Sequence, residues 1–403
     1  MHDVVVIGGG LSGCFCASHL ARAGLKVLVV EEHPRTGDPR YCTGIIGKEA
    51  FDRFELPAAP IQETYTSAIF YSPLGSYVRV SQDTPQAFII NRAEFDSELA
   101  LSALNAGAQF FYSTRCTGFE NEGDRLRVTL QEKSGGRKSV TTKTVVLSSG
   151  TFYGLHKGLG INRPSQFLDT AQAEVDARGI FEVEVHFGKS VAPGSFAWAS
   201  PLPHGRARIG LSTYRNAKFH LDRFLTSDTF KNRLPKQPFH IKRKVIPIQP
   251  LKKSYGNRFL IIGDAAGQVK PTTGGGIYYA LLSAHLASET LIEGFKNNRL
   301  DERQMRQYQD KWEREIGREL KIGSITRRLL RHISDNQIDS LIRFFQRKES
   351  KVLIDKYANF DWHHNIILAM SKDPAFWLHL SRHILKLKVE VITPKPRTPV
   401  RKF

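Results

Sequence analysis

The run Val4-Val5-Val6-Ile7, followed by Gly8-Gly9-Gly10-Leu11-Ser12-Gly13, decides the fold of this 403-residue chain. Four consecutive apolar residues without polar alternation predict a buried parallel strand. Gly8 permits a tight turn, Gly10 leaves room for a pyrophosphate beside the backbone, and Gly13 lets the next helix pack close to the strand. We therefore predict a strand, a glycine turn and a helix that together bind a dinucleotide.

The residues after the glycine turn continue this pattern. A helix is expected over 14–23, ending at Gly24, and the N–H groups at its start favour a phosphate. Residues 27–30 form the second predicted strand, and Glu31 follows at the position expected for a ribose-binding acid. Its carboxylate is suited to accept hydrogen bonds from both ribose hydroxyls and would repel a 2′-phosphate. This register predicts a nucleotide site but does not separate FAD from NAD.

A second glycine motif lies at the other end of the same predicted domain. The apolar run 259–262 reads as a strand, and Gly263-Asp264-Ala265-Ala266-Gly267 follows it. At this strand tip, the Asp264 carboxylate is suited to flavin ribityl hydroxyls or to backbone near the pyrophosphate. Residues 274–276 are glycines that lead into a helix expected over 280–291, whose start would stabilise negative charge on a reduced flavin. Two such motifs in one domain favour FAD.

These motifs resemble those of the geranylgeranyl reductase family, FAD-dependent oxidoreductases of the p-hydroxybenzoate hydroxylase-like group. Residues 263–280 resemble the family's second FAD motif. Pro39-Arg40-Tyr41-Cys42-Thr43-Gly44 is similar to its loop beside the isoalloxazine, and residues 91–96 resemble its Arg-x-x-Phe-Asp helix start. Residues 196–201 are similar to its aromatic-x-Trp-x-x-Pro segment in the substrate domain. Together with the first motif, the resemblance implies FAD contacts at Gly8, Gly10, Ser12, Gly13, Glu31, Cys42, Thr43, Arg92, Cys116 (lining the adenine), Asp264, Gly276 and Ile277.

The resemblance implies hydride transfer from reduced FAD to an isolated carbon–carbon double bond of an isoprenoid. The chain to be reduced would be carried by a lipid, a diphosphate or a quinone. Phe196, Trp198 and Pro201 are expected in the substrate site, where the two aromatic rings would stabilise a cationic intermediate. Cys42 is the candidate catalytic residue, to position substrate or relay a proton. The alternatives are that both rings belong to the core and that Cys42 contacts FAD through its backbone alone.

The electron donor stays open. The larger group usually has Ala-Asp-Gly near residue 150, where this chain has Ser148-Ser149-Gly150. The missing acid argues against a nicotinamide-handling role at this position, and so favours a ferredoxin, a quinol or another flavoprotein over NADPH as the donor.

Several other functions fit the same motifs. An FAD-dependent monooxygenase or epoxidase would use the same cofactor residues with oxygen. Trp198 and Pro201 partly match a flavin halogenase motif, which Phe196 and Ser200 break. A quinone-linked electron-transfer flavoprotein would reduce quinone without saturating a lipid, and a membrane-binding protein with a vestigial site would not take up FAD.

The predicted fold is α/β, with a Rossmann-like FAD-binding domain, an inserted antiparallel-sheet substrate domain and a helical C-terminal region. The FAD-binding domain is assigned 1–60, 88–160 and 253–295. The substrate domain is assigned 61–87 and 161–252, where alternating runs at 181–185 and 206–211 predict strands. Residues 296–403 form the basic helical region, which ends in a loose Pro-rich tail.

The formal net charge of +19 is high for an enzyme of small molecules, and much of it lies late in the chain. Apolar residues recur at helical spacing between Ile325 and Phe345 among basic ones, which is typical of a helix on an anionic membrane surface. A solvated basic face on a packed helical lobe is the alternative. Nucleic-acid binding is not expected, since no recognised binding motif accompanies the charge.

The cysteine pattern and the search for targeting segments indicate the cellular location that we expect. The four cysteines form no CxxC pair, which is typical of a reduced cytoplasmic protein. No metal site is expected, because neither the cysteines nor His363-His364 have neighbouring ligands at metal spacing. The first strand leaves no room for a signal peptide, and no apolar run approaches the ~20 residues that span a bilayer. We expect a cytoplasmic enzyme, free or peripheral on the inner face of the cytoplasmic membrane.

Overall fold

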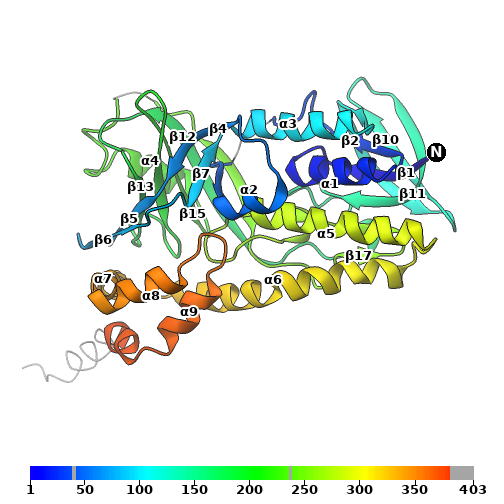
Figure 1. Ribbon diagram of the computed structural model, residues 1–403. Coiled ribbons are helices and arrows are strands. Elements are labelled where there is room, and N and C mark those ends of the chain that lie inside the picture. The colour runs from blue at the N-terminus through cyan, green and yellow to red at the C-terminus, as the bar shows by residue number, and fades with distance from the viewer. Residues whose placement is uncertain (39–41, 236–237, 382–403) are drawn as a thin grey trace, which may run out of the picture.

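The computed structural model describes residues 1–38, 42–235 and 238–381. Within these ranges the chain forms an α/β core, a second sheet beside it and a row of C-terminal helices that runs under both (Figure 1). Pro39, Arg40 and Tyr41 of the predicted flavin loop, and the predicted basic tail, lie outside the described residues.

The core sheet is built around β1 (His2–Ile7), as the opening apolar run predicts. Its strand order is β17-β18-β11-β1-β2-β8, and all neighbours on this path are parallel except β17 and β18. The remaining strands of this sheet are β2 (Val27–Val30), β8 (Gln109–Phe111), β9 (Thr114–Asn121), β10 (Leu126–Glu132), β11 (Arg137–Leu147), β17 (Tyr255–Gly256) and β18 (Phe259–Ile261). β9, β10 and β11 form an antiparallel meander.

Both faces of β1 are buried from Val4 to Ile7, which explains the unbroken apolar run there. Val4 and Val6 pack against α1 (Leu11–Arg22), α3 (Arg92–Asn105) and α5 (Ile277–Lys296). Val5 and Ile7 face the opposite cluster, which the meander covers. α1 and α5 each begin three residues before the expected starts, because the helices open directly after their glycine turns. Gly24 follows the end of α1 with a φ of +84°, as a helix-terminating glycine should.

The second sheet has the strand order β16-β12-β15-β14-β13-β5-β6. Its strands are β5 (Ser67–Tyr71), β6 (Tyr77–Ser81), β12 (Phe167–Asp176), β13 (Val183–His186), β14 (Ala197–Leu202), β15 (Arg206–Thr213) and β16 (Lys242–Pro247). The sheet is antiparallel except between β13 and β5, which come from two separate segments of the chain and pair in parallel. The strand expected over 181–185 begins only at Val183, and Phe181 before it is 86% exposed. α4 (Ala217–Leu225) packs on β12 and β15.

A small third sheet joins the two larger ones. It pairs β3 (Ile45–Gly47) and β4 (Ile61–Tyr65) with β7 (Ala87–Ile90), and α2 (Lys48–Phe54) follows β3 directly. Single 3-10 turns occur at η1 (Lys157–Leu159) and η2 (Gly263–Ala266). The residue boundaries of the two proposed domains stay a prediction.

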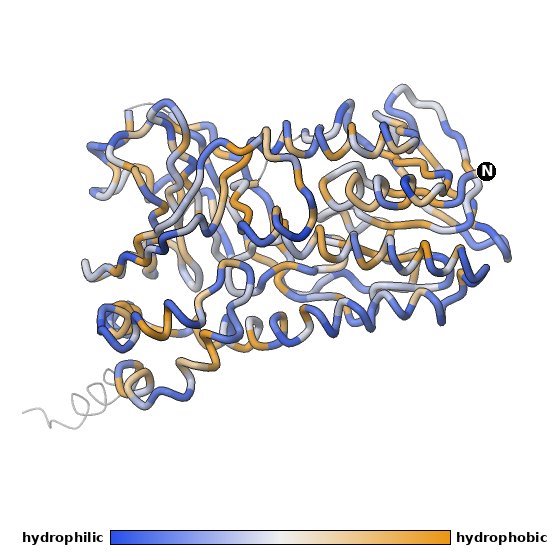
Figure 2. Tube along the Cα trace, viewed as in Figure 1, coloured by the Kyte–Doolittle hydropathy of each residue, from blue (hydrophilic) through white to orange (hydrophobic). Residues whose placement is uncertain are grey.

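The C-terminal region is helical up to the last described residues. α6 (Glu302–Leu330) packs along α5, and α7 (Asp335–Phe345), α8 (Lys348–Tyr357) and α9 (His364–Ser371) follow below the second sheet (Figure 1). Hydrophobic and hydrophilic residues are interspersed along α7 to α9 (Figure 2). Across the described ranges, no helix is long and apolar enough to cross a membrane.

Candidate active site

A single cavity of about 1240 Å³ brings together the core, the second sheet and the C-terminal helices. Its walls include ten of the residues that the sequence singled out. They are Gly10, Ser12, Cys42, Thr43, Arg92, Phe196, Trp198, Asp264, Gly276 and Ile277. Five others lie outside this lining: Gly8, Gly13, Glu31, Cys116 and Pro201.

Three of the four glycines of the first motif have different structural roles. Gly8 has a φ of +105°, and a Cβ there would lie 2.5 Å from the Ser148 carbonyl oxygen. A Cβ at Gly13 would overlap the Gly8 carbonyl oxygen, so both positions need glycine for the fold itself. Gly10 has an ordinary φ of −78°, and a Cβ there would meet nothing within 4 Å. The protein's own packing therefore does not require glycine at position 10, which fits a ligand approaching that backbone.

Two helices begin at this cavity without a side-chain cap. Gly10 is the N-cap of α1 and Gly276 is the N-cap of α5, and neither start receives a side-chain hydrogen bond. By contrast, the N-cap Asn91 of α3 accepts from two backbone N–H groups of its own helix. Free N–H groups at a helix start bind anionic groups. The two uncapped starts therefore fit the pyrophosphate and the pyrimidine edge of FAD.

Glu31 lies behind the first turn, at the end of β2. Its carboxylate accepts hydrogen bonds from the Gly9 N–H at 2.6 Å and the His33 N–H at 2.9 Å. These bonds fix the carboxylate next to the glycine turn, where the ribose is expected. Cys116, expected beside the adenine, is a residue of β9. Its side chain is buried in the core cluster, and its thiol contacts the Gly118 carbonyl at 3.5 Å.

Arg92 and Cys42 lie side by side in the wall of the cavity. Arg92 forms an ion pair with Asp96 at 2.8 Å, and its guanidinium also contacts the Cys42 side chain. Burial alone would lower the pKa of Arg92, but Asp96 raises it above its ordinary value. The arginine is therefore a permanent positive charge beside Cys42 and the cofactor site.

The second sheet holds the Cys42 loop in place. The Gln172 side-chain amide donates to the Cys42 carbonyl at 3.2 Å, and the Thr43 hydroxyl donates to the Gln172 side-chain oxygen at 3.2 Å. The Arg208 guanidinium donates to the Thr43 carbonyl and also pairs with Glu174 at 2.7 Å. Sequence reasoning missed these residues. Their only signal is the occurrence of Gln172 and Glu174 inside the largely buried strand β12.

Phe196 and Trp198 line the same cavity. Their rings lie 6.1 Å apart at an angle of 60°, and the indole N–H is buried with no hydrogen-bond partner among the described residues. Pro201 does not share this face. Its carbonyl accepts a hydrogen bond from Tyr65, a residue that does line the cavity.

The segment 359–364 packs against the second FAD motif and holds it in position. Lys270 forms a buried ion pair with Asp361 at 2.8 Å, with side chains 4% and 2% exposed. Glu319 accepts the His363 and His364 backbone N–H groups, each at 2.9 Å, and lies 2.7 Å from the His364 ring. These contacts account for the histidine pair. Across the described ranges, no group of three or more His, Cys, Asp or Glu side chains is arranged to hold a metal ion.

The amphipathic pattern between Ile325 and Phe345 turns its apolar side chains largely into the cavity. The apolar lining from the C-terminal region includes Leu329, Leu330, Ile333, Ile338, Leu341, Ile342, Phe345, Ile366, Ile367, Met370 and Phe376. One cavity thus joins the predicted flavin site to an apolar extension under the second sheet.

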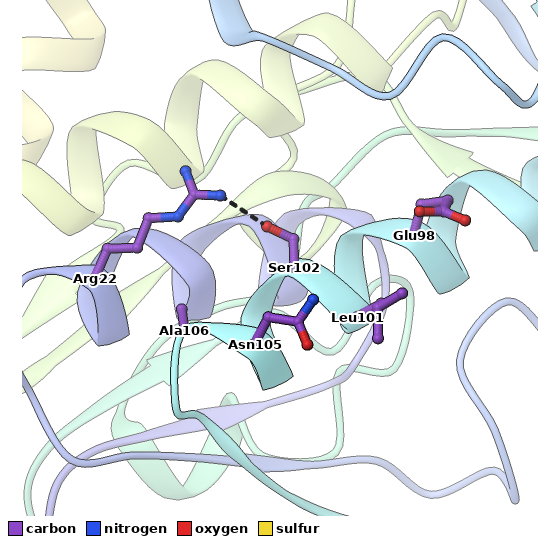
Figure 3. Close-up of a pocket in the computed structure, with 6 residues that line it drawn as sticks. All are labelled: Arg22, Glu98, Leu101, Ser102, Asn105 and Ala106. Atoms are coloured by element: carbon purple, nitrogen blue, oxygen red, sulfur yellow. Dashed lines mark hydrogen bonds between the residues drawn. The ribbon is translucent and has the colours of Figure 1, made fainter.

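A smaller cavity of about 410 Å³ lies on the outer side of α1 and α3 and shares no residue with the large one (Figure 3). Its lining is mostly polar, and Arg22 donates to Ser102 across it at 3.0 Å.

Comparison with known proteins shows the family to which the chain belongs. It is 30% identical over 354 residues to the digeranylgeranylglycerophospholipid reductase of Methanocaldococcus jannaschii, covering 85% of this chain and 90% of that protein. The chain belongs to the geranylgeranyl reductase family of FAD-dependent oxidoreductases. A second member, digeranylgeranylglycerophospholipid reductase 2 of Methanothermobacter thermautotrophicus, is 30% identical over 86% of this chain and 92% of its own length. The profile of the family described as FAD dependent oxidoreductase matches residues 3–62.

Solved structures support the same fold for this geranylgeranyl reductase family member. A geranylgeranyl bacteriochlorophyll reductase-like protein from Thermoplasma acidophilum superposes with a TM-score of 0.83 at 21% identity, over 96% of this chain and 99% of that one. The p-nitrophenol 4-monooxygenase of Pseudomonas putida gives 0.69 at 17% identity, over 88% and 96%. The FAD-dependent halogenase of chondrochloren biosynthesis gives 0.66 at 17%, over 79% and 81%. Monooxygenases and halogenases therefore share the architecture, but at lower similarity.

Proposed function

We propose that this protein reduces carbon–carbon double bonds in the geranylgeranyl-type chain of an isoprenoid lipid. The observation that carries the proposal is the single cavity that joins the uncapped starts of α1 and α5 to the apolar extension under the second sheet. The relatives named digeranylgeranylglycerophospholipid reductases support the same substrate class. When bound, FAD supplies the hydride.

The chain's own residues would bind and orient the two reactants. Glu31 and the backbone of the first glycine turn would hold the ribose and pyrophosphate. The aromatic faces of Phe196 and Trp198 would stabilise positive charge that develops on the isoprenoid. The loop held by Gln172 and Arg208 would fix Cys42 beside the reacting bond, where its thiol would position the substrate or pass a proton to it.

The cavity opens where apolar side chains reach the surface. Leu329 is 63% exposed, Leu330 is 44% exposed and Trp377 is 48% exposed, and all three line the cavity. Arg328 and Lys372 are exposed nearby in the sequence. An apolar mouth with basic neighbours favours contact with an anionic bilayer. We therefore propose that the enzyme works as a peripheral protein on the inner face of the cytoplasmic membrane.

The proposed activity is tested by anaerobic turnover of dithionite-reduced enzyme, read by mass spectrometry. The substrates would be geranylgeranyl diphosphate, an unsaturated prenyl ether lipid and a menaquinone. A mass gain of one H₂ per double bond in a prenyl chain is expected. A flavin that is bound and reducible but leaves every substrate unchanged would refute the proposal, and turnover that needs oxygen would indicate a monooxygenase instead.

Two further measurements test the identity of the electron donor and the role of Cys42. Anaerobic bleaching of the flavin by NADPH, by a reduced ferredoxin or by a quinol identifies the electron donor. Cys42→Ala should slow turnover strongly while FAD remains bound. Full turnover in Cys42→Ala would remove the proton role of the thiol.

A further inference from the structure

We infer that Arg327 and Arg331, at the end of α6, form a binding site for the phosphate group of the isoprenoid substrate. The inference rests on the proposed function for the presence of an isoprenoid chain in the cavity. It adds the chemical class of the group to which that chain is attached, and the side chains that recognise it.

Arg327 is a buried cation that pairs with no acidic side chain among the described residues. Its side chain lines the cavity, and the residue is 6% exposed. The guanidinium donates to the carbonyls of Pro271 and Thr272 at 3.1 and 2.8 Å and to the Ser195 hydroxyl at 2.8 Å. Its buried Nε has no hydrogen-bond partner among the described residues. A buried charge with only neutral acceptors is unfavourable unless an anion accompanies it.

Arg331 lies one helical turn further along and also lines the cavity. Its guanidinium stacks over the Tyr214 ring at 4.2 Å, and that of Arg327 lies 5.7 Å from the same ring. Within the described part of the chain, neither arginine forms an ion pair. Two like charges at positions i and i+4 repel each other, and a bound dianion would convert this repulsion into attraction.

The surroundings of the pair are suited to phosphate oxygens. The hydroxyls of Ser195 and Ser212 lie 2.5 Å apart on the cavity wall, and the exposed Lys189 also lines it. Asp335 is the nearby acid, but its carboxylate accepts the Lys189 backbone N–H at 2.9 Å and does not line the cavity. The polar group would thus be bound by cations and hydroxyls.

The same helix end supplies the apolar part of the path. Leu330 and Ile333 flank Arg331 in the cavity lining, and Ile338 and Leu341 continue it. A ligand with a phosphate at one end and a long apolar chain behind it matches this order of residues. A quinone lacks the anion, so the site favours a prenyl phosphate or a prenylated glycerophosphate over a prenyl quinone.

The test compares two ligands that differ only in the phosphate. Geranylgeranyl monophosphate and geranylgeraniol would be titrated into oxidised holoenzyme by calorimetry. The phosphate should tighten binding roughly tenfold or more, which is the scale of one charge-assisted hydrogen-bond pair. Arg331→Gln should remove most of this difference and leave geranylgeraniol binding unchanged. Arg328→Gln is the matched control, because Arg328 is exposed on the same turn and does not line the cavity.

The outcomes separate an anion site from a structural role. Equal weakening of both ligands by Arg331→Gln would show that the arginine only supports the helix end and would overturn the inference. A native enzyme that binds both ligands equally would overturn it too. Competition by inorganic phosphate, and titration of geranylgeranyl diphosphate against digeranylgeranylglyceryl phosphate, would show whether the anion belongs to a free prenyl phosphate or to a lipid.

Turnover is measured separately on the same preparations, so the two proposals fail independently. A phosphate preference that Arg331→Gln abolishes, without any reduction of prenyl chains, would keep the anion site and refute the reductase. Reduction of both neutral and phosphorylated chains with identical KM values, unchanged in Arg331→Gln, would keep the reductase and refute the anion site.

Discussion

Gly10→Ala should block FAD binding without harming the fold, whereas Gly13→Ala should harm the fold itself. At Gly10 the backbone is extended, with φ −78° and ψ −174°, and the added Cβ meets nothing within 4 Å. The loss of a glycine N-cap costs up to about 1 kcal/mol, and the reduced freedom of the unfolded chain returns about 0.4–1 kcal/mol. The free energy of unfolding of the Gly10→Ala apo-protein should therefore lie within about 1 kcal/mol of that of the native apo-protein.

The effect on FAD follows from the same methyl group. It would stand where a pyrophosphate must approach the backbone, so FAD should bind at least roughly tenfold more weakly. At Gly13 the Cβ would overlap the Gly8 carbonyl oxygen and lie 2.6 Å from the Ser148 hydroxyl. Overpacking of this kind costs about 1–3 kcal/mol or more.

The assay combines urea unfolding of the apo-proteins with FAD titration followed by flavin fluorescence. Gly118→Ala on β9 is the control, because a Cβ there also meets nothing within 4 Å but lies away from the cavity. It should change neither quantity. A Gly10→Ala protein that binds FAD as tightly as the native one would refute the placement of the pyrophosphate against this turn.

Three further predictions concern the groups around the site. Asp361→Asn should lower the free energy of unfolding by about 3–5 kcal/mol, because it leaves the buried Lys270 ammonium unpaired. A Lys270→Met, Asp361→Leu double variant should lose less free energy of unfolding, because no buried charge remains. Urea denaturation measures both effects. Burial and the Lys270 charge lower the pKa of His363 from 6.5 to about 4, so between these pH values the unfolded chain binds a proton that the folded chain does not. The free energy of unfolding should therefore fall by roughly 3 kcal/mol as the pH drops through this window. His363→Asn should flatten that part of the stability profile, and an unchanged slope would contradict the assignment. Gln172→Leu should lower kcat with little change in FAD affinity, because it frees the Cys42 loop, while Gln131→Leu on β10 should leave both unchanged.

The sequence determined the parts of the site that depend on neighbours along the chain. The β1–turn–α1 unit, the position of Glu31 at the end of β2 and the second glycine motif all follow from short runs whose geometry is local. The residues Val4 to Ile7 of β1 contribute alternately to the core clusters on the two faces of the sheet, which explains why this run is uniformly apolar. Family resemblance extended this to Cys42, Thr43 and Arg92, which the structure gathers at one cavity.

Tertiary structure alone decided what surrounds those parts. Gln172 reaches Cys42 across 130 positions and Arg208 reaches Thr43 across 165, and no local pattern encodes such contacts. Pro201 falls outside the cavity because side chains of β14 alternate between faces and Trp198 occupies the face that meets the cavity. Cys116 falls outside it because no residue of β9 lines the cavity, and sheet packing decides both outcomes. From the sequence alone, the apolar residues of α6 and α7 fit a membrane face equally well. Only the tertiary structure shows that most of them line the cavity, while Leu329 and Leu330 also remain exposed. The sequence shows the charges of Arg327 and Arg331, but the absence of an acid opposite them within the described chain depends on which segments the fold brings near.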